Sequence, residues 1–177
     1  HVGVWGTYIT TPIVKPNYAD VRISTTVQNQ SGNSEAIKVK QVILNSKGDE
    51  VARALISGSI LSETTKDFEV IAQIANPIRW ELENPMLYKV VTTIYKNNEV
   101  IDSYSTLFGV RTIRFTADDG FYLNDKRVQL KGVNLHSDFG PLGVAFNVRA
   151  MERQLEIMKS MGANAIRNSH MLRLLKF

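Results

Sequence analysis

Residues 123–136, LNDKRVQLKGVNLH, and residues 164–170, NAIRNSH, decide the fold of this 177-residue chain. Each stretch contains a short apolar strand that runs into polar side chains capable of chemistry. Between them the sequence predicts an amphipathic helix, with Asn147 as its N-cap and Gly162 as its C-cap. The apolar stripe of this helix consists of Met151, Leu155, Met158 and Met161. Together with a buried strand over 163–166, these elements predict a β-α-β unit with two parallel strands.

The polar side chains at the two strand ends are candidates for a functional site. Asn134 and His136 end the first strand, and Arg167 and His170 end the second. A single histidine after a strand is more often structural, but convergent polar groups at the carboxyl ends of neighbouring parallel strands favour a site. Zinc is the rival interpretation. Two histidines without a third ligand at suitable spacing support it only weakly, so the sequence predicts no metal site.

The sequence before residue 108 alternates apolar and polar residues, as half-buried strands do. Turn-forming clusters such as QSGNS at 30–34 separate the runs. The predicted strands cover 20–29, 35–44, 66–74, 87–96 and 100–107, and the last two are joined in hairpin style by Asn97 and Asn98. Short strands at this spacing predict an immunoglobulin-like β-sandwich. A β-hairpin with Asn124 and Asp125 at its turn follows the sandwich.

Composition argues against several classes of protein. The net charge is +4, but lysines and arginines are spread along the chain and usually sit near acids, as in KGDE at 47–50. No phosphate-binding face, and so no nucleic-acid partner, is predicted. The chain has no cysteine for disulfides or thiolate metal sites. It contains no run of about 18 apolar residues that would predict a transmembrane helix, and its first residues lack the pattern of a signal peptide. Periplasmic and cytoplasmic locations both stay open.

Four phrases of the sequence resemble glycoside hydrolase family 2. They are WELENPMLY at 80–88, FGVRTIRF at 108–115 and the stretches 123–136 and 164–170 quoted above. The resemblance implies an immunoglobulin-like sandwich over 1–113 and the N-terminal portion of a truncated (β/α)8, or TIM-barrel, catalytic domain over 114–177. The expected fold class is therefore mainly β, with a sandwich, a β-hairpin and the first β-α-β unit of the barrel. At the junction, Gly109 is expected to let the chain bend.

The same resemblance implies an activity, a substrate and site residues. The full-length parent protein, of which this chain would be a fragment, would be a retaining β-glycosidase that hydrolyses O-glycosidic bonds in carbohydrates. It would be most similar to β-galactosidases, with β-glucuronidases and β-mannosidases as alternatives. His136 and His170 would contact the sugar, and Arg167 would lie beside the nucleophilic carboxylate and keep it ionised. Asn134 and Asp138 are further candidates for substrate binding. No cofactor is implied, and use of a divalent or monovalent cation by the parent stays open.

Both catalytic glutamates of the family belong to later barrel strands, so the 177-residue chain is predicted to be inactive by itself. An incomplete barrel would expose apolar faces, and we therefore expect homo-oligomers. Residues 171–177, MLRLLKF, replace a proline-rich phrase of the family, and we predict that a single missing base has shifted the reading frame there. The alternative is a non-catalytic carbohydrate-binding or interaction module. The aromatic residues of the strands fit packing better than an exposed platform: Tyr88, Tyr95, Tyr104 and Phe108.

Overall fold

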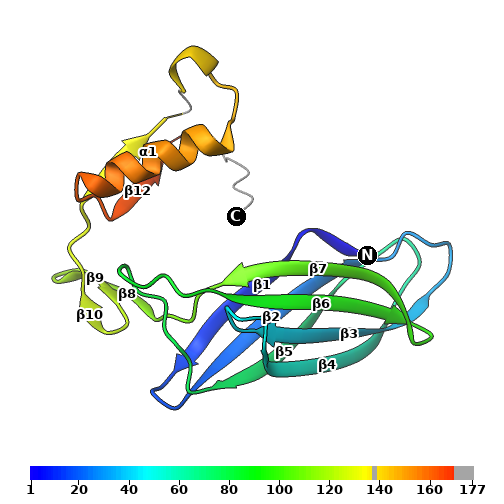
Figure 1. Ribbon diagram of the computed structural model, residues 1–177. Coiled ribbons are helices and arrows are strands. Elements are labelled where there is room, and N and C mark those ends of the chain that lie inside the picture. The colour runs from blue at the N-terminus through cyan, green and yellow to red at the C-terminus, as the bar shows by residue number, and fades with distance from the viewer. Residues whose placement is uncertain (137–138, 170–177) are drawn as a thin grey trace. The chain divides into compact units, whose positions relative to one another are not determined.

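The computed structural model describes residues 1–136 and 139–169 of the chain. The chain divides into two compact units. The sandwich unit comprises residues 1–113 and 123–125, and the C-terminal unit comprises residues 114–122 and the chain from 126 onward. Figure 1 follows the chain from the blue, cyan and green strands of the sandwich unit to the orange helix and red strand of the C-terminal unit.

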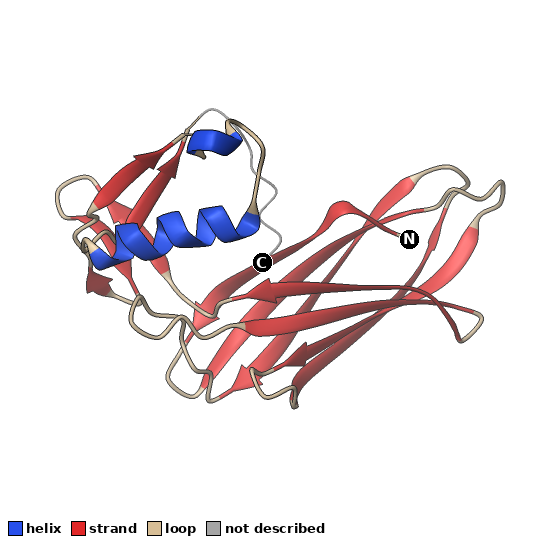
Figure 2. Ribbon diagram, turned by 45° about the horizontal axis from the view of Figure 1, so that its top comes forward, coloured by secondary structure: helices blue, strands red, loops and turns tan. Residues whose placement is uncertain are grey.

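Seven strands in the described part of the chain build the sandwich unit as two antiparallel sheets (Figures 1 and 2). One sheet has the order β1-β2-β5, with bounds Val2–Val14, Tyr18–Gln28 and Thr65–Ala75. The other has the order β4-β3-β6-β7, with bounds Glu50–Ile60, Glu35–Leu44, Tyr88–Lys96 and Glu99–Phe108. This confirms the expected sandwich. Because β4 pairs with β3, the fourth strand joins the sheet opposite to the one it joins in a constant-type immunoglobulin domain.

The core of the sandwich unit follows from the alternation of its strands. Ile23 from one sheet packs in the same cluster as Ile43 and Val90 from the other, and all three are fully buried. A buried amide lies in the same interior. The Nε2 atom of Gln41 donates to Thr25 Oγ1 at 2.7 Å, and its Oε1 atom accepts from Thr92 Oγ1 at 2.7 Å. Gln41 therefore links the two sheets through hydrogen bonds that offset the cost of burying its amide.

The aromatic residues of the sandwich divide between core and surface. Tyr88 and Phe108 are buried with ring centroids 5.7 Å apart, which confirms their expected role in packing. Tyr95 is half-buried. For Tyr104 the expectation was wrong, because 43% of this residue is exposed. It lies on β7, which is the edge strand next to β6 in its sheet.

Strands β1 and β4 were not predicted individually. Along β4, half-buried residues alternate with exposed ones, but its inward positions include the small residues Ala52 and Ala54, which give a faint apolar signal. In β1, the register against β2 shifts between Val2 and Thr7, and Trp5 adopts a positive φ of 60°. Such irregularity removes the strict period of two on which sequence prediction of strands depends.

Trp80 makes close contacts with residues 109–111, which follow β7, the last strand of the sandwich unit. Its backbone nitrogen donates to the Val110 carbonyl at 2.9 Å, and its ring lies 4.8 Å from the Arg111 guanidinium. Gly109 packs directly against Trp80, and its φ is not in the left-handed region. The glycine is thus required for space beside the indole, rather than for the bend that the sequence suggested.

The hairpin turn at Asn124 and Asp125 forms despite the absence of glycine. Both residues have positive φ, 51° and 65°. The Asn124 side chain is buried, accepts from the Thr112 backbone nitrogen at 3.1 Å and donates to the Trp80 carbonyl at 2.9 Å. These bonds offset the cost of the left-handed conformation, which asparagine tolerates better than most residues.

The C-terminal unit contains a small antiparallel sheet and a β-α-β unit. The sheet has the order β10-β9-β8, with bounds Lys126–Arg127, Gly120–Leu123 and Ile113–Thr116. The β-α-β unit consists of β11 (Gly132–Leu135), the short helix η1 (Gly140–Leu142), α1 (Val148–Ser160) and β12 (Ala165–Asn168). β11 and β12 are parallel, as expected, and α1 is the long blue helix of Figure 2.

Helix α1 agrees with most of what the sequence predicted, but the position of Met161 and the identity of the C-cap differ from the prediction. Asn147 is the N-cap and accepts from the Ala150 nitrogen at 3.0 Å, and Met151 is buried with Leu155 and Met158 packed against its cluster. Met161 is 74% exposed, because the helix ends at Ser160 and the periodicity no longer holds beyond it.

The end of the helix and the strand that follows also depart from the predicted bounds. The C-cap is Met161, and Gly162 is the next residue, with a φ of 88°. The strand expected at 163–166 runs over Ala165–Asn168 and is not buried, because α1 covers only one of its faces. No helix among the described residues is long and apolar enough to cross a membrane.

Candidate functional site

The parallel pairing of β11 with β12 brings the polar residues of two distant segments together. In the register of the two strands, Asn134 is the partner of Arg167 and Leu135 is the partner of Asn168. The Ser169 backbone nitrogen continues the pairing beyond β12 by donating to the Leu135 carbonyl at 3.0 Å. Residues that follow the two strands therefore leave the sheet at the same edge.

Alternation along the strands assigns each side chain to a face. Leu135 is buried in a cluster with Phe139 and Met151, so its face of the sheet is the one covered by α1. Asn134 and Arg167 lie on the opposite face, because adjacent side chains of a strand point to opposite sides. Both side chains are exposed on this face.

Hydrogen bonds join three side chains on this edge. Ser169 Oγ donates to Asn134 Oδ1, and the Asn134 amide nitrogen lies 3.0 Å from His136 Nε2. Ser169 is buried, although sequence reasoning did not select it as a site residue. Its position two residues after Arg167 was the available signal, since residues two apart share a face of a strand.

The opposite edge of the two strands is fixed by Asn164. Its backbone nitrogen donates to the Lys131 carbonyl at 3.0 Å, and its Oδ1 atom accepts from the Lys131 nitrogen at 2.8 Å. Its Nδ2 atom donates to the Gln129 carbonyl at 3.0 Å. These bonds secure the register on which the pairing of Asn134 with Arg167 depends.

The remaining predicted site residues, Asp138 and His170, lie outside the described residues. Within the described ranges, no group of three or more histidine, aspartate or glutamate side chains could hold a metal ion. The carboxylates of α1 are occupied elsewhere. Glu152 and Glu156 both accept from Arg149, at 3.0 and 2.9 Å, and these bonds, of which the bond to Glu156 has the largest effect, raise the pKa of Arg149.

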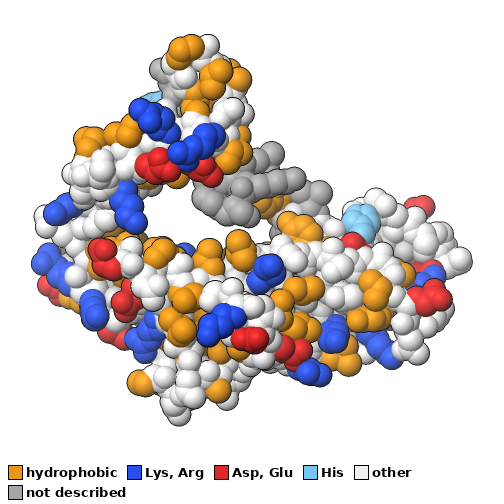
Figure 3. Space-filling view, viewed as in Figure 1, with side chains coloured by type: hydrophobic (Ala, Val, Ile, Leu, Met, Phe, Trp, Pro, Cys, Tyr) orange, Lys and Arg blue, Asp and Glu red, His pale blue; other side chains and the backbone are white. Residues whose placement is uncertain are grey.

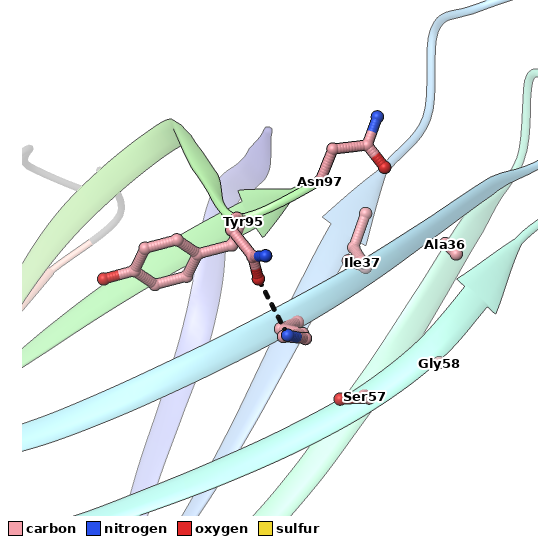
Figure 4. A pocket seen from close by; sticks show the side chains of 8 residues that line it. Ala36, Ile37, Ser57, Gly58, Tyr95 and Asn97 are labelled. Atoms are coloured by element: carbon pink, nitrogen blue, oxygen red, sulfur yellow. Dashed lines mark hydrogen bonds between the residues drawn. The ribbon is translucent and has the colours of Figure 1, made fainter.

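A shallow pocket of about 510 Å³ lies on the sandwich unit at the turn between β6 and β7 (Figure 4). It bears on the alternative of a non-catalytic sugar-binding module. Its lining is Ala36, Ile37, Lys38, Ser57, Gly58, Tyr95, Asn97 and Asn98. Tyr95 is the aromatic residue of this set, and Figure 4 shows its side chain pointing away from that of Asn97. A single half-buried ring is a poor platform for stacking a sugar.

Charges on the visible surface are mixed in sign. Figure 3 shows lysine and arginine side chains interspersed with acidic ones on that face. Ion pairs among the described residues include Arg22 with Glu69 at 3.6 Å and Lys96 with Glu35 at 2.8 Å.

Comparison with protein families gives two matches. Residues 2–111 match the model of glycosyl hydrolases family 2, and residues 115–173 match that of its TIM barrel domain. A β-galactosidase of Bacteroides ovatus is 39% identical over 170 residues, covering 96% of this chain and 20% of the relative. A β-glucuronidase of Formosa agariphila is 29% identical over 167 residues, covering 93% of this chain and 17% of the relative. The chain thus spans about a fifth of the length of these relatives.

Solved structures of similar proteins support the same assignment. A glycosyl hydrolase family 2 member from Bacteroides cellulosilyticus matches with a TM-score of 0.91 and 32% identity, over 97% of this chain and 24% of that one. A β-glucuronidase of Bacteroides uniformis matches with a TM-score of 0.83 and 30% identity, over 93% of this chain and 20% of that one. From its sandwich, its β-α-β unit and these matches, the chain belongs to glycoside hydrolase family 2.

Proposed function

We propose that this chain supplies the sandwich and the opening β-α-β unit of a retaining β-glycosidase that hydrolyses β-galactosides. The β-galactosidase of Bacteroides ovatus, at 39% identity, favours this substrate class, and β-glucuronides are the alternative because several relatives are β-glucuronidases. The observation that carries the proposal is the register pairing of Asn134 with Arg167, with His136 hydrogen-bonded to Asn134 at the carboxyl ends of the strands. Active sites of (β/α)8 barrels form at that end.

The proposed division of the chain places the sandwich at 1–113 and the start of the barrel at 114–177. Within the barrel segment, His136, His170, Arg167, Asn134 and Asp138 are proposed to bind the substrate. Histidine and asparagine side chains offer donors and acceptors to sugar hydroxyls, and arginine offers a fixed positive charge for a neighbouring carboxylate. The cation would stabilise the ionised form that a retaining nucleophile requires.

The 177-residue chain by itself is proposed to be inactive. Retaining glycosidases use two carboxyl groups about 5 Å apart, one as nucleophile and one as acid and base. The described glutamates of the C-terminal unit are Glu152 and Glu156, which belong to α1 and pair with Arg149. Leu135 packs against α1, so α1 covers the face of the sheet opposite to the one that carries Asn134 and Arg167. The carboxylates of Glu152 and Glu156, which belong to α1, therefore cannot act on the face of Asn134 and Arg167.

We also propose that the chain associates with itself. Large apolar side chains of the C-terminal unit are exposed, among them Phe115, Val144 and Met161. Exposing large apolar side chains to water costs free energy. Self-association would remove part of this apolar surface from water.

A chimaera tests the proposed activity. Residues 2–169 would replace the matching segment of the Bacteroides ovatus β-galactosidase, which supplies the rest of the barrel. We expect hydrolysis of nitrophenyl β-galactoside by the chimaera and none by the 177-residue chain. A folded chimaera that cleaves neither the β-galactoside nor the β-glucuronide would contradict the proposal, and so would sustained turnover by the chain alone.

A further inference from the structure

The hydrogen bonds among Ser169, Asn134 and His136 have a direction. The Ser169 hydroxyl donates to Asn134 Oδ1, which identifies the oxygen side of the amide. The nitrogen side then faces His136 Nε2 at 3.0 Å. An amide nitrogen carries two donor hydrogens and cannot accept, so in this orientation of the amide His136 Nε2 accepts with its lone pair.

We propose that Ser169 and Asn134 are positioning residues that set the tautomer of the neutral His136 ring, with its proton on Nδ1 and its lone pair on Nε2. The functional meaning of this inference rests on the proposed sugar-binding role of His136, but the tautomer itself does not. In isolated histidine the proton favours Nε2, so the two residues reverse the ordinary preference of the ring.

The surroundings make the arrangement stiff. Ser169 is only 3% exposed, and its backbone nitrogen is bonded to the Leu135 carbonyl at 3.0 Å, so its hydroxyl has little solvent to turn toward. Asn134 lies inside β11, with its backbone in register with Arg167 on β12. The two polar atoms of the amide therefore lie between Ser169, which follows β12, and His136, which follows β11, and these two partners favour one orientation of the amide.

The tautomer decides what His136 offers a ligand. A neutral imidazole has one nitrogen that donates a hydrogen bond and one that accepts. In the other tautomer the two nitrogens exchange these roles, so a ligand hydroxyl bonded to one of them would have to reverse its own role. The serine thus acts on the histidine from a neighbouring strand without touching the ligand. Sequence inspection alone ranks this serine below the adjacent histidine and arginine.

Nitrogen NMR of the ¹⁵N-labelled 177-residue chain tests the proposal without substrate. The protonated and unprotonated nitrogens of a neutral imidazole give well-separated resonances, and the spectra are recorded at about pH 8. His136→Gln identifies the signals of His136 among those of the three histidines. We expect a protonated Nδ1 and an unprotonated Nε2 in the unchanged chain.

Two variants and a control complete the experiment. Ser169→Ala removes the donor to Oδ1 and is expected to move the proton toward Nε2. Asn134→Asp offers only acceptor oxygens to the ring and is expected to place the proton on Nε2. Ser160→Ala, which removes a hydroxyl that donates to the Ile157 carbonyl on α1, should leave the tautomer unchanged.

An Nε2-protonated ring in the unchanged chain would overturn the proposal, because the amide would then be reversed. Retention of the Nδ1 proton in a folded Ser169→Ala chain would overturn it as well. Since neither measurement involves catalysis, failure here is distinct from failure of the proposed glycosidase activity.

Discussion

Gly109 and Trp80 approach each other so closely that a Cβ atom at position 109 would lie 2.8 Å from the Cβ atom of Trp80. Gly109→Ala therefore forces the indole or the backbone to shift, and we expect a loss of about 1–3 kcal/mol in the free energy of unfolding. Chemical denaturation followed by tryptophan fluorescence measures it. Gly32→Ala is the matched control, because nothing lies within 4 Å of the added atom.

A stability within about 0.5 kcal/mol of the unchanged chain for both glycine variants would contradict this account. It would mean that the contact relaxes without cost. The control is informative because neither Gly32 nor Gly109 has a φ in the left-handed region, so the two substitutions differ only in the space available.

The sequence predicted the sandwich well where its alternation was strong, and less well elsewhere. Over 20–29 the apolar residues Val21, Ile23 and Val27 stand at alternate or every fourth position, and all three are buried in β2. The small inward side chains of β4 carry too little apolar signal, and the prediction of five strands omitted it. The choice of β3 as the neighbour of β4 depends on contacts between distant segments, which a local pattern does not encode.

The candidate site was predictable in its strands but not in its hydrogen bonds. The pairing of Asn134 with Arg167 follows from two parallel strands with polar ends. Ser169 was missed because a serine has no distinct chemistry until its neighbour is known, and that neighbour lies 35 residues earlier in the chain. Met161 was wrongly assigned to the core because the helical spacing of apolar residues continues in the sequence past Ser160, where the helix ends.

Gln41 is expected to contribute to the stability of the sandwich through satisfied hydrogen bonds. Gln41→Leu leaves the buried hydroxyls of Thr25 and Thr92 without this partner, and a loss of about 1–3 kcal/mol is expected on denaturation. Adding Thr25→Val and Thr92→Val should recover much of the loss, because apolar groups of similar shape need no partner. Gln73→Leu, on an exposed side chain bonded to Asp20, is the control and should be nearly neutral. A triple variant less stable than Gln41→Leu would count against this interpretation.

The pKa of Glu35 is lowered, chiefly by the hydrogen bond from Lys96, whose nitrogen lies 2.8 Å from Glu35 Oε2, and also by the Lys96 charge and by Ser31, against an opposing effect of burial. A carboxyl whose pKa is lower in the folded chain stabilises it above the unfolded pKa, and this is lost as the pH falls through the folded pKa. In Lys96→Met the pKa of Glu35 should rise, measured by carboxyl ¹³C titration. Lys89→Met, on the same strand, should leave it unchanged, and equal titration curves for all three chains would refute the assignment.

Self-association is expected to involve the C-terminal unit. Light scattering should give a mass above that of the monomer that increases with concentration, since exposed Met161 and Phe115 favour burial against another apolar surface. Met161→Lys should lower the mass. Leu55→Lys, at an exposed leucine of β4 in the sandwich unit, is the control and should have little effect. A strictly monomeric mass at high concentration would exclude this association.

Arg167 provides the sharpest test of the proposed site, in the chimaera with the Bacteroides ovatus relative. Arg167→Ala should lower kcat by about 10²–10³, as the loss of a charged donor at a reacting centre does. Without the cation, the pKa of the neighbouring nucleophile should rise, so the acidic limb of the kcat/KM profile should move to higher pH. Arg167→Lys keeps the charge without the planar fork, and is expected to restore the pH profile more fully than kcat. Arg153→Lys, on the exposed face of α1, is the control and should change neither. If Arg167→Ala retained both the kcat and the pH profile of the chimaera, this edge of the sheet would not be the active-site edge.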